Sequence, residues 1–521
     1  MTSRPGWAFF LLCAAVAAGF GLQIRSLGFY NDDYAWLPPL ASAAPATLWN
    51  LCRSLFLDHY GDFVARPSIP VYIAVLFRLC GQNPVLHQSV FLLIDAAIAW
   101  NFYRLLVEEG VSRPSALSAA VLAALYPNHD ATHHWMTNSV APLALAGTLW
   151  AVRAWRRGER EGSAVFRVTA LLSYLFFALL YEASALLALL PAVLEAWRLH
   201  REGRSPVSAA KGALSRHWPP AACLAAVVAY QRVLIPAILH SEKHAMSLPL
   251  MHVWKVFQAG VECTLLNRLT HLVARSAQYA LREFGGLDWL AFSLAALLLA
   301  GWDRAAARTS ERPSEALPVL AAAFFVLGYA PYIFDPTYTP TIFNPTNRVN
   351  LVASLGGAAF WAWLTARLRT AERPRTRTLG GVLSILLLSG FLLCDQVSGL
   401  QWARAAGLQR EILSGLDPLL AGVEGPVDLL LYGIPERIGS GTVFESTYDF
   451  NGALRLRTAR EDLQGRVGQG RVRFEKGRAV LSWYGETPLS YERLHVYDAS
   501  RKNLVRIPDK AAGDAFLLKM N

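Results

Sequence analysis

Two adjacent carboxylates, Asp32 and Asp33, stand in the stretch GFYNDDYAWL, directly after the first long apolar run of the chain. A carboxylate held at a membrane surface can act as a general base, because it can take the proton of an attacking hydroxyl group. The same side chains can instead cap the next helix, since Asn and Asp are favoured at the N-cap position. Which role applies depends on where the other polar groups of the chain lie.

Other charged residues also have both a chemical and a structural interpretation. Arg348 lies in NPTNRVN, and its guanidinium suits two-point binding of a phosphate. Glu182 interrupts a nearly continuous apolar run, where an ionisable group is costly and marks either a functional site or a structural polar network. Asp95, inside another apolar run, has the same two alternatives, and Arg66 lies in GDFVARPS, further along the chain from the acid pair.

The stretch PNHDATHHW, residues 127–135, combines three histidines with one carboxylate. His129 and His133 would share one face of a helix at the i, i+4 spacing, which suits a metal site. Asp130 would point elsewhere on that helix, and no HExxH-like pattern indicates zinc. We therefore predict no metal ligands, while a divalent cation at the substrate site stays open.

The composition is typical of a membrane protein. Of 521 residues, 54% are hydrophobic and 17% are charged, against roughly 25% charged in an ordinary soluble domain. The run at residues 7–24 carries no charge over a length close to the roughly 20 residues that cross a bilayer. It is longer than the roughly 7 to 15 residues of a signal-peptide core, so we expect a retained first helix.

Apolar blocks separated by charged loops predict eleven spans. Strongly basic loops, such as 153–160 and 367–377, alternate with longer loops of mixed charge. Positive loops face the cytoplasm, so we expect a cytoplasmic N-terminus. The net charge of +11 is then a topology signal, and we expect no nucleic-acid partner. The expected spans lie at about residues 7–24, 86–106, 114–127, 137–152, 166–181, 183–197, 218–238, 287–302, 316–332, 350–366 and 379–394.

This topology places the acid pair, Arg66, the histidine stretch, Glu182 and Arg348 on one side of the membrane. Ordinary solvated loops would not need to place all of these residues on the same side. The first outer loop, residues 25–85, is too long for a simple connector, so we expect short helices at the membrane surface over 46–60 and 68–80. The expected outer segments are 25–85, 127–136, 239–286, 333–349 and everything after 395.

The composition changes after Cys394, where charges, glycines and short alternating stretches replace the apolar blocks. We therefore predict a membrane domain over 1–394 and a small, β-rich outer domain over 395–521. Its expected strands and hairpins lie at 426–435, 470–485 and 493–507.

The order of these motifs resembles the GT-C superfamily of integral-membrane glycosyltransferases, in particular the protein O-mannosyltransferases and the bacterial aminoarabinose transferases. The matching features are the acid pair, the run RPSIPVYIAVLFRLCGQNPVLH at 66–87, PNHDATHHW, YEAS and the Asn-Arg before a late span. They cover roughly residues 7 to 400. The chain lacks the tetratricopeptide repeats of eukaryotic members, and the tail after 395 matches no family pattern.

The resemblance implies an all-α, polytopic GT-C fold in the inner (plasma) membrane. It implies a donor sugar linked to a polyprenyl phosphate, used on the outer side, and an acceptor hydroxyl on a protein, lipid or glycan. One of the two acids would be the base, by family position Asp32, with Asp33 orienting Asp32 or the acceptor; the sequence alone leaves open which of the two takes the proton. Arg348 would stabilise the departing phosphate. The alternative functions are a transporter or flippase of lipid-linked saccharides and a membrane scaffold. Further candidates for substrate contacts are Arg66, His129, Asp130, His134, Glu182 and Asn347.

Overall fold

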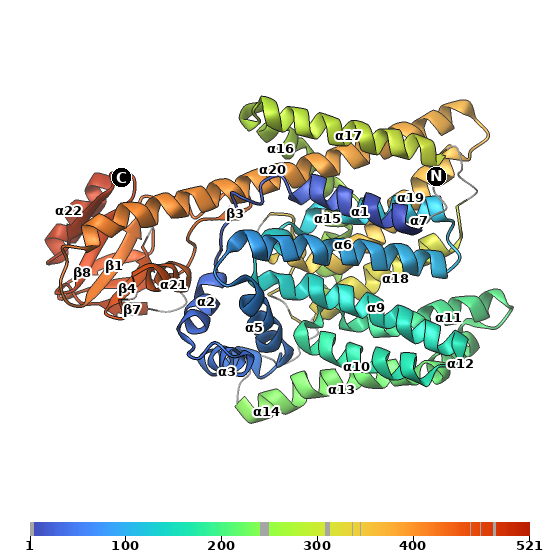
Figure 1. Ribbon diagram of the computed structural model, residues 1–521, viewed down its shortest axis with the longest axis horizontal. Helices are drawn as coiled ribbons and strands as arrows, with labels where there is room; N and C mark the ends of the chain where they lie inside the picture. Colours follow the sequence, from blue (N-terminus) through green and yellow to red (C-terminus); the bar gives the residue numbers. More distant parts are fainter. Residues whose placement is uncertain are drawn as a thin grey trace.

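Among the residues that the structure describes, helices fill the chain as far as Leu420 and strands occur only after it (Figure 1). The expected all-α membrane domain, followed by a small C-terminal domain with sheets, is therefore confirmed. The computed structural model describes residues 5–239, 250–307, 313–335, 337–343, 345–458, 460–468, 470–482 and 486–520. Three of the segments named above, 239–286, 333–349 and 470–485, lie partly outside the described residues, at 240–249, at Pro336 and Asn344, and at 483–485.

Each predicted span coincides with a helix. Within the described ranges, six helices are long and apolar enough to cross a membrane, and Gly6–Phe20, Ser68–Cys80 and Ala164–Leu180 are apolar but shorter. The helices under the predicted spans are α1 (Pro5–Phe20), α6 (Pro84–Glu108), α7 (Arg113–Ala124), α9 (Val140–Glu161), α10 (Ala164–Leu180), η3 (Glu182–Leu189) with α11 (Leu190–Arg201), α13 (Trp218–Ala229) with η4 (Tyr230–Leu234) and α14 (Ile235–Leu239), α17 (Gly286–Ala307), α18 (Ala316–Tyr329) with η6 (Ala330–Phe334), α19 (Leu351–Arg369) and α20 (Pro374–Leu420).

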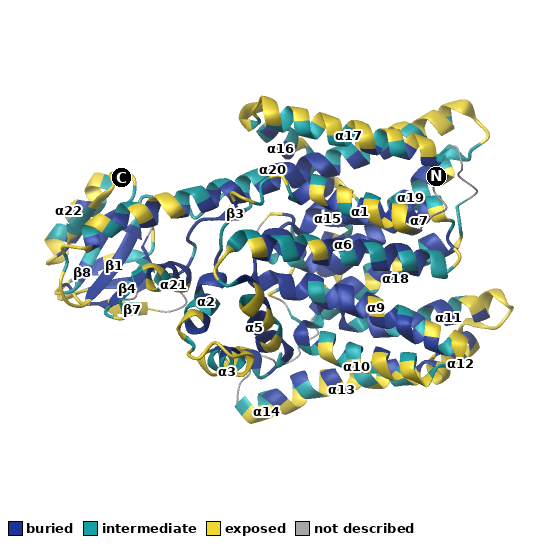
Figure 2. Cartoon of the chain, viewed as in Figure 1, coloured by how far each residue is buried: buried dark blue, intermediate teal, exposed yellow. Residues whose placement is uncertain are grey.

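Several helices turn apolar side chains away from the protein interior. The helices Trp218–Leu239 and Gly286–Ala307 each bury only 17% of their most apolar stretch. Leu297 and Leu298 on α17, for example, are exposed. Figure 2 shows this exposure along α10, α13 and α17, in contrast to the buried middle of the bundle. Outward apolar faces of this length suit lipid, so the helical domain is that of a membrane-embedded protein.

The two ends of the chain lie at opposite ends of the helical bundle (Figure 1). The basic turns after α9 and between α19 and α20 lie at the end near the N-terminus, which we call the basic end. Helix α2 (Asp33–Ser42), which follows Asp32, lies at the other end, on the side of the C-terminal domain. This separation of the basic turns from α2 agrees with the predicted topology. That the basic turns face the cytoplasm stays a prediction.

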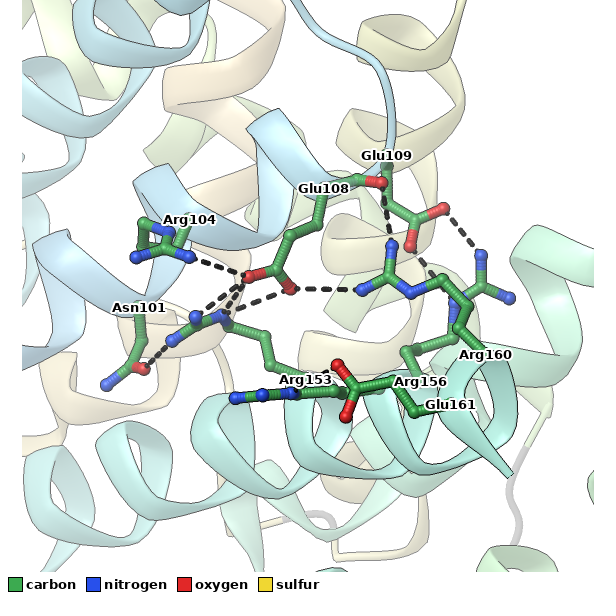
Figure 3. Close-up of polar contacts among 9 residues, drawn as sticks. Asn101, Arg104, Glu108, Glu109, Arg153, Arg156, Arg160 and Glu161 are labelled. Atoms are coloured by element: carbon green, nitrogen blue, oxygen red, sulfur yellow. Dashed lines mark hydrogen bonds and ion pairs between the residues drawn. The ribbon is translucent and has the colours of Figure 1, made fainter. Parts of the chain in front are cut away.

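Arginines at the end of α9 are tied to the end of α6 (Figure 3). Arg153 donates from Nη2 to Oε1 of Glu108 at 2.8 Å and from Nη1 to Oδ1 of Asn101 at 2.7 Å. Arg156 pairs with Glu109 at 2.8 Å between Nη2 and Oε2. Charge-assisted bonds of this kind are stronger than neutral ones. The basic stretch 153–160, expected as a loop, is the last part of α9 and holds two helices of the bundle together.

The first outer loop forms four helices, as expected of a segment with its own structure. The helices predicted over 46–60 and 68–80 are present, and polar caps fix where helices of this region begin. The Thr47 side chain accepts the N–H of Asn50, and the Asn83 side chain accepts the N–H of Val85. After α2, the helices are α3 (Leu48–Asp58), α4 (Tyr60–Phe63) and α5 (Ser68–Cys80).

The outer segment 239–286 was not predicted to contain helices, but it forms α15 (Leu250–Thr264) and α16 (Asn267–Glu283). Helix α16 buries Leu269, Ser276 and Ala280 and leaves its arginines outside, so no continuous apolar block marks it in the sequence. The neighbouring outer loops also contain short helical turns: η1 (Pro127–His129), α8 (Ala131–His134), η2 (Thr137–Ser139) and η7 (Pro345–Asn350).

Helix α20 continues without a break past residue 395, where we placed the domain division, and carries the chain to the C-terminal domain (Figure 1). The first strand there, β1 (Val427–Tyr432), pairs in parallel with β4 (Leu463–Val467) and β8 (Leu494–Asp498), and β8 pairs antiparallel with β9 (Asn503–Arg506). Parallel pairing needs a crossover, and α21 (Thr447–Thr458), which was not predicted, lies between β1 and β4. The remaining elements are β2 (Arg437–Ile438), β3 (Gly441–Thr442), β5 (Val472–Glu475), β6 (Arg478–Ser482), β7 (Glu486–Leu489) and α22 (Lys510–Met520).

We expect Glu108→Gln to lower the free energy of unfolding by about 1.5–3 kcal/mol, because Arg153 would lose a charged partner. The matched control is Glu161→Gln, since Glu161 forms an exposed i, i+4 pair with Arg157 and such a pair contributes about 0.3–0.5 kcal/mol. Thermal unfolding of both variants in detergent measures the difference. Equal loss in the two variants would contradict a stabilising role for the Glu108 contacts.

Candidate functional site

A cavity of about 640 Å³ lies at the end of the bundle that carries α2. Its walls come from segments far apart in the chain: the first outer loop, the starts of α9 and η3, the turn before α19, and the C-terminal domain. Four of the predicted site residues line it, namely Asp32, Arg66, Glu182 and Arg348.

Asp32 directs its carboxylate to this cavity. It stands immediately before α2, but its side chain makes no capping hydrogen bond to that helix. Burial raises the pKa of Asp32, and the positive charge of Arg348 acts against that rise. A carboxylate with a raised pKa is a stronger base once ionised. The structure therefore places Asp32 in the cavity wall, where its side chain does not cap α2.

Asp33 is fully buried and does not line the cavity. Its carboxylate accepts the backbone N–H of Tyr30 at 2.9 Å, that of Met136 at 3.2 Å and that of Thr137 at 2.8 Å. These bonds join the acid loop to the segment that leads into α9. Because its oxygens are engaged with the backbone, Asp33 holds the loop in place and does not face a substrate.

Arg348 lines the cavity from η7. Its Nη1 donates to Oδ1 of Asn138 at 2.8 Å, and its guanidinium carbon lies 6.0 Å from the centre of the Tyr338 ring. Its Nε is buried and has no hydrogen-bond partner among the described residues. An anionic oxygen could satisfy this donor, so the guanidinium suits a phosphate.

Arg66 and Glu182 form a two-point ion pair in the cavity wall. Nε of Arg66 donates to Oε2 of Glu182 at 2.8 Å, and Nη2 donates to Oε1. The guanidinium also lies over the Tyr181 ring, 5.2 Å from its centre. The pair explains why the apolar run tolerates an acid at Glu182, since a charge in such a place needs a partner.

Asp130 and Asn347 do not line this cavity, and Asp130 lines a second cavity of about 540 Å³. Asp130 accepts hydrogen bonds from Ser398 Oγ at 2.6 Å, from Trp402 Nε1 at 3.0 Å and from Nδ2 of Asn347. These contacts tie η7 to η1 and to α20. The two residues, predicted as substrate contacts, therefore position the turn that carries Arg348.

His129 and His134 are also buried away from this cavity. Nδ1 of His129 lies 3.0 Å from Oδ1 of Asn128, and the His134 ring packs 5.8 Å from the Trp402 ring. Asp95, left open above between function and structure, lies 2.8 Å from Nδ1 of the buried His133. The structure thus uses the histidine stretch for packing and internal hydrogen bonds.

No three His, Cys, Asp or Glu side chains within the described ranges are placed to hold a metal ion. The sequence analysis missed several lining residues, including His59, Asp62 and Asp335. His59 lies in the segment predicted as a surface helix and Asp62 in the stretch GDFVARPS that follows it, and no local signal marks either as a site residue. Only the folding of α4 against α2 brings them to the cavity.

No family model and no curated protein matches the chain. Among solved structures, the chain is similar to ArnT from Cupriavidus metallidurans in the apo state, at 12% identity over 89% of this chain and 85% of that chain, with a TM-score of 0.41. It is also similar to the same protein bound to undecaprenyl phosphate, at 12% identity over 90% and 86%, with a TM-score of 0.39.

We expect Asp33→Asn to lower the free energy of unfolding by about 1–3 kcal/mol, because the amide nitrogen that replaces one carboxylate oxygen cannot accept a backbone N–H. Asp32→Asn serves as the matched variant and should unfold like the wild type. Thermal unfolding in detergent measures both. Wild-type stability in Asp33→Asn would contradict the anchoring role.

Proposed function

We propose that the protein is an inverting glycosyltransferase that moves a sugar from a polyprenyl-phosphate donor to a hydroxyl acceptor. The observation that carries the proposal is the meeting of Asp32 and Arg348 in one cavity. A base and a cation with a free donor are the two groups that this reaction needs. The motif order, which resembles the GT-C superfamily, supports the same reaction.

In this mechanism the Asp32 carboxylate takes the proton of the acceptor hydroxyl. The acceptor oxygen forms a bond to the anomeric carbon, while the bond from that carbon to the phosphate oxygen breaks. One displacement inverts the configuration at the anomeric carbon. The electron pair leaves with the phosphate, and Arg348 stabilises the charge that develops there.

The wall of the cavity supplies further contacts. Arg66 belongs to the same outer loop as Asp32, lines the same cavity, and is held by Glu182, a residue distant in the chain. Two of its nitrogens are used by Glu182, so it serves as a fixed cation that orients the donor. We assign Asn138 a positioning role, since it accepts a hydrogen bond from Arg348.

The position of the cavity suits a lipid-linked donor. A polyprenyl chain stays in the bilayer, so the reacting group must meet its phosphate at the membrane boundary. The cavity lies at the end of the bundle, where the apolar helices give way to α2 and to the C-terminal domain (Figure 1). We infer an outer-side reaction in the inner membrane with a protein, lipid or glycan acceptor, the N-terminus being cytoplasmic.

Asp32→Asn in the purified, reconstituted protein tests the proposal. We expect its transfer rate from a polyprenyl-phosphate sugar to fall by about 10²- to 10⁴-fold, the contribution typical of a general base. Asp58→Asn changes an exposed acid of α3 and should keep the wild-type rate. A transporter or flippase would move the lipid across the membrane without transferring its sugar. A wild-type transfer rate in Asp32→Asn would reject Asp32 as the base.

The rate should also depend on pH through Asp32. The base works only when ionised, so kcat/KM should fall as the pH drops through the raised pKa of Asp32. The charge of Arg348 lowers that pKa, so Arg348→Gln should move this fall to higher pH and raise the KM for the donor. A pH profile of kcat/KM measures both effects. An unchanged profile and KM in Arg348→Gln would contradict the role given to Arg348.

A further inference from the structure

The C-terminal domain reaches into the cavity that contains Asp32. Tyr448, the second residue of α21, lines this cavity together with Asp32 and Arg348. Helix α21 belongs to the crossover between β1 and β4, far from the acid loop in the chain. The sequence analysis gave this domain no role in the site.

Helix α21 packs very closely against the acid-bearing helix α2. A Cβ atom on Gly452 of α21 would lie 1.8 Å from the carbonyl oxygen of Tyr34, so only glycine permits this approach. A second link runs through α20: Tyr34 donates to Oε1 of Gln409 at 3.3 Å, and Gln409 donates to the carbonyl of Val443 at 2.6 Å. The C-terminal domain is therefore docked on the start of α2 and is not a separate module on a flexible linker.

Two side chains of this domain hold the residue before Asp32. Asn31 has a φ of 44°, a conformation that few residues other than glycine adopt. The Tyr448 hydroxyl donates to Oδ1 of Asn31 at 2.8 Å, and Nδ2 of Asn31 donates to Oε2 of Glu445 at 3.4 Å. Glu445 in turn forms an ion pair with Arg437. The oxygen and the nitrogen of the Asn31 side-chain amide are therefore both bound by the C-terminal domain, which holds Asn31 in its turn.

Tyr448 lines the cavity together with Asp32 and lowers the pKa of the Asp32 carboxyl, against the rise caused by burial. Partial burial and the negative charge of Asp32 raise the pKa of Tyr448, so this hydroxyl keeps its proton throughout the neutral range. This proton is donated to Asn31, so the hydroxyl cannot act as the base itself.

We propose that Tyr448 is a positioning residue for Asp32, and that the C-terminal domain completes the catalytic cavity through it. Tyr448 fixes the turn at Asn31 and directs the Asp32 carboxylate towards the acceptor hydroxyl. This inference rests on the proposed function, because it assigns Tyr448 a task in the reaction of Asp32.

Tyr448→Phe removes the hydroxyl and keeps the ring. In the reconstituted protein we expect kcat at neutral pH to fall about three- to tenfold, the acid-side fall of the kcat/KM profile to move to higher pH, and the KM for the donor to stay unchanged. Tyr491→Phe is the matched control, since the Tyr491 hydroxyl donates to the Glu475 carbonyl within the same domain, away from the cavity. It should match the wild type in all three measurements.

Asn31→Gly tests the route of the effect. Glycine accepts the positive φ but removes both contacts to the C-terminal domain, so this variant should show the same loss of kcat as Tyr448→Phe. If the two act through one turn, the double variant should lose little more than either single variant. Independent, multiplicative losses would contradict the proposed route through Asn31.

The failure of this inference can be told apart from that of the proposed function. An active Asp32→Asn variant would reject the base itself. An inactive Asp32→Asn variant together with a wild-type rate and pH profile in Tyr448→Phe would leave the function standing and overturn the role of Tyr448.

Discussion

The buried carboxylate of Asp33 is the constraint on which the candidate site depends. By accepting three backbone N–H groups from the acid loop and from the segment before α9, it fixes two loops that are about a hundred residues apart. Its neighbour Asp32 is thereby left with no capping task and faces the cavity. The two adjacent acids have opposite environments, so one serves the fold and the other is free for chemistry.

Three further contacts complete the same cavity from distant parts of the chain. Asp130 and Asn347 hold the turn that carries Arg348, the Arg66 and Glu182 pair forms part of the wall, and α21 brings Tyr448 to Asp32. Each link joins residues at least a hundred positions apart. The cavity is therefore a product of the whole fold, in which the C-terminal domain takes part.

The sequence predicted those elements that a local pattern of apolar and polar residues marks. Continuous apolar blocks located the helices of the bundle, and alternating stretches located β1, β8 and β9. It failed where one face of an element is polar, as in α16, and where a helix continues into a new environment, as α20 does past residue 395. Residue type alone identified Asp32 and Arg348, but it could not separate them from Asp130 and His134, because only tertiary packing decides which polar groups face the cavity.

The central claim is that one cavity brings the donor phosphate to Arg348 and the reacting carbon to Asp32. The most direct measurement is an experimental structure of the reconstituted protein with a polyprenyl phosphate bound. The account predicts phosphate density within hydrogen-bond distance of the Arg348 guanidinium, inside the cavity that Asp32 lines, with the lipid chain leading to the bilayer. Phosphate density elsewhere, for example in the second cavity lined by Arg275 and Arg282, with the Asp32 cavity empty, would contradict it.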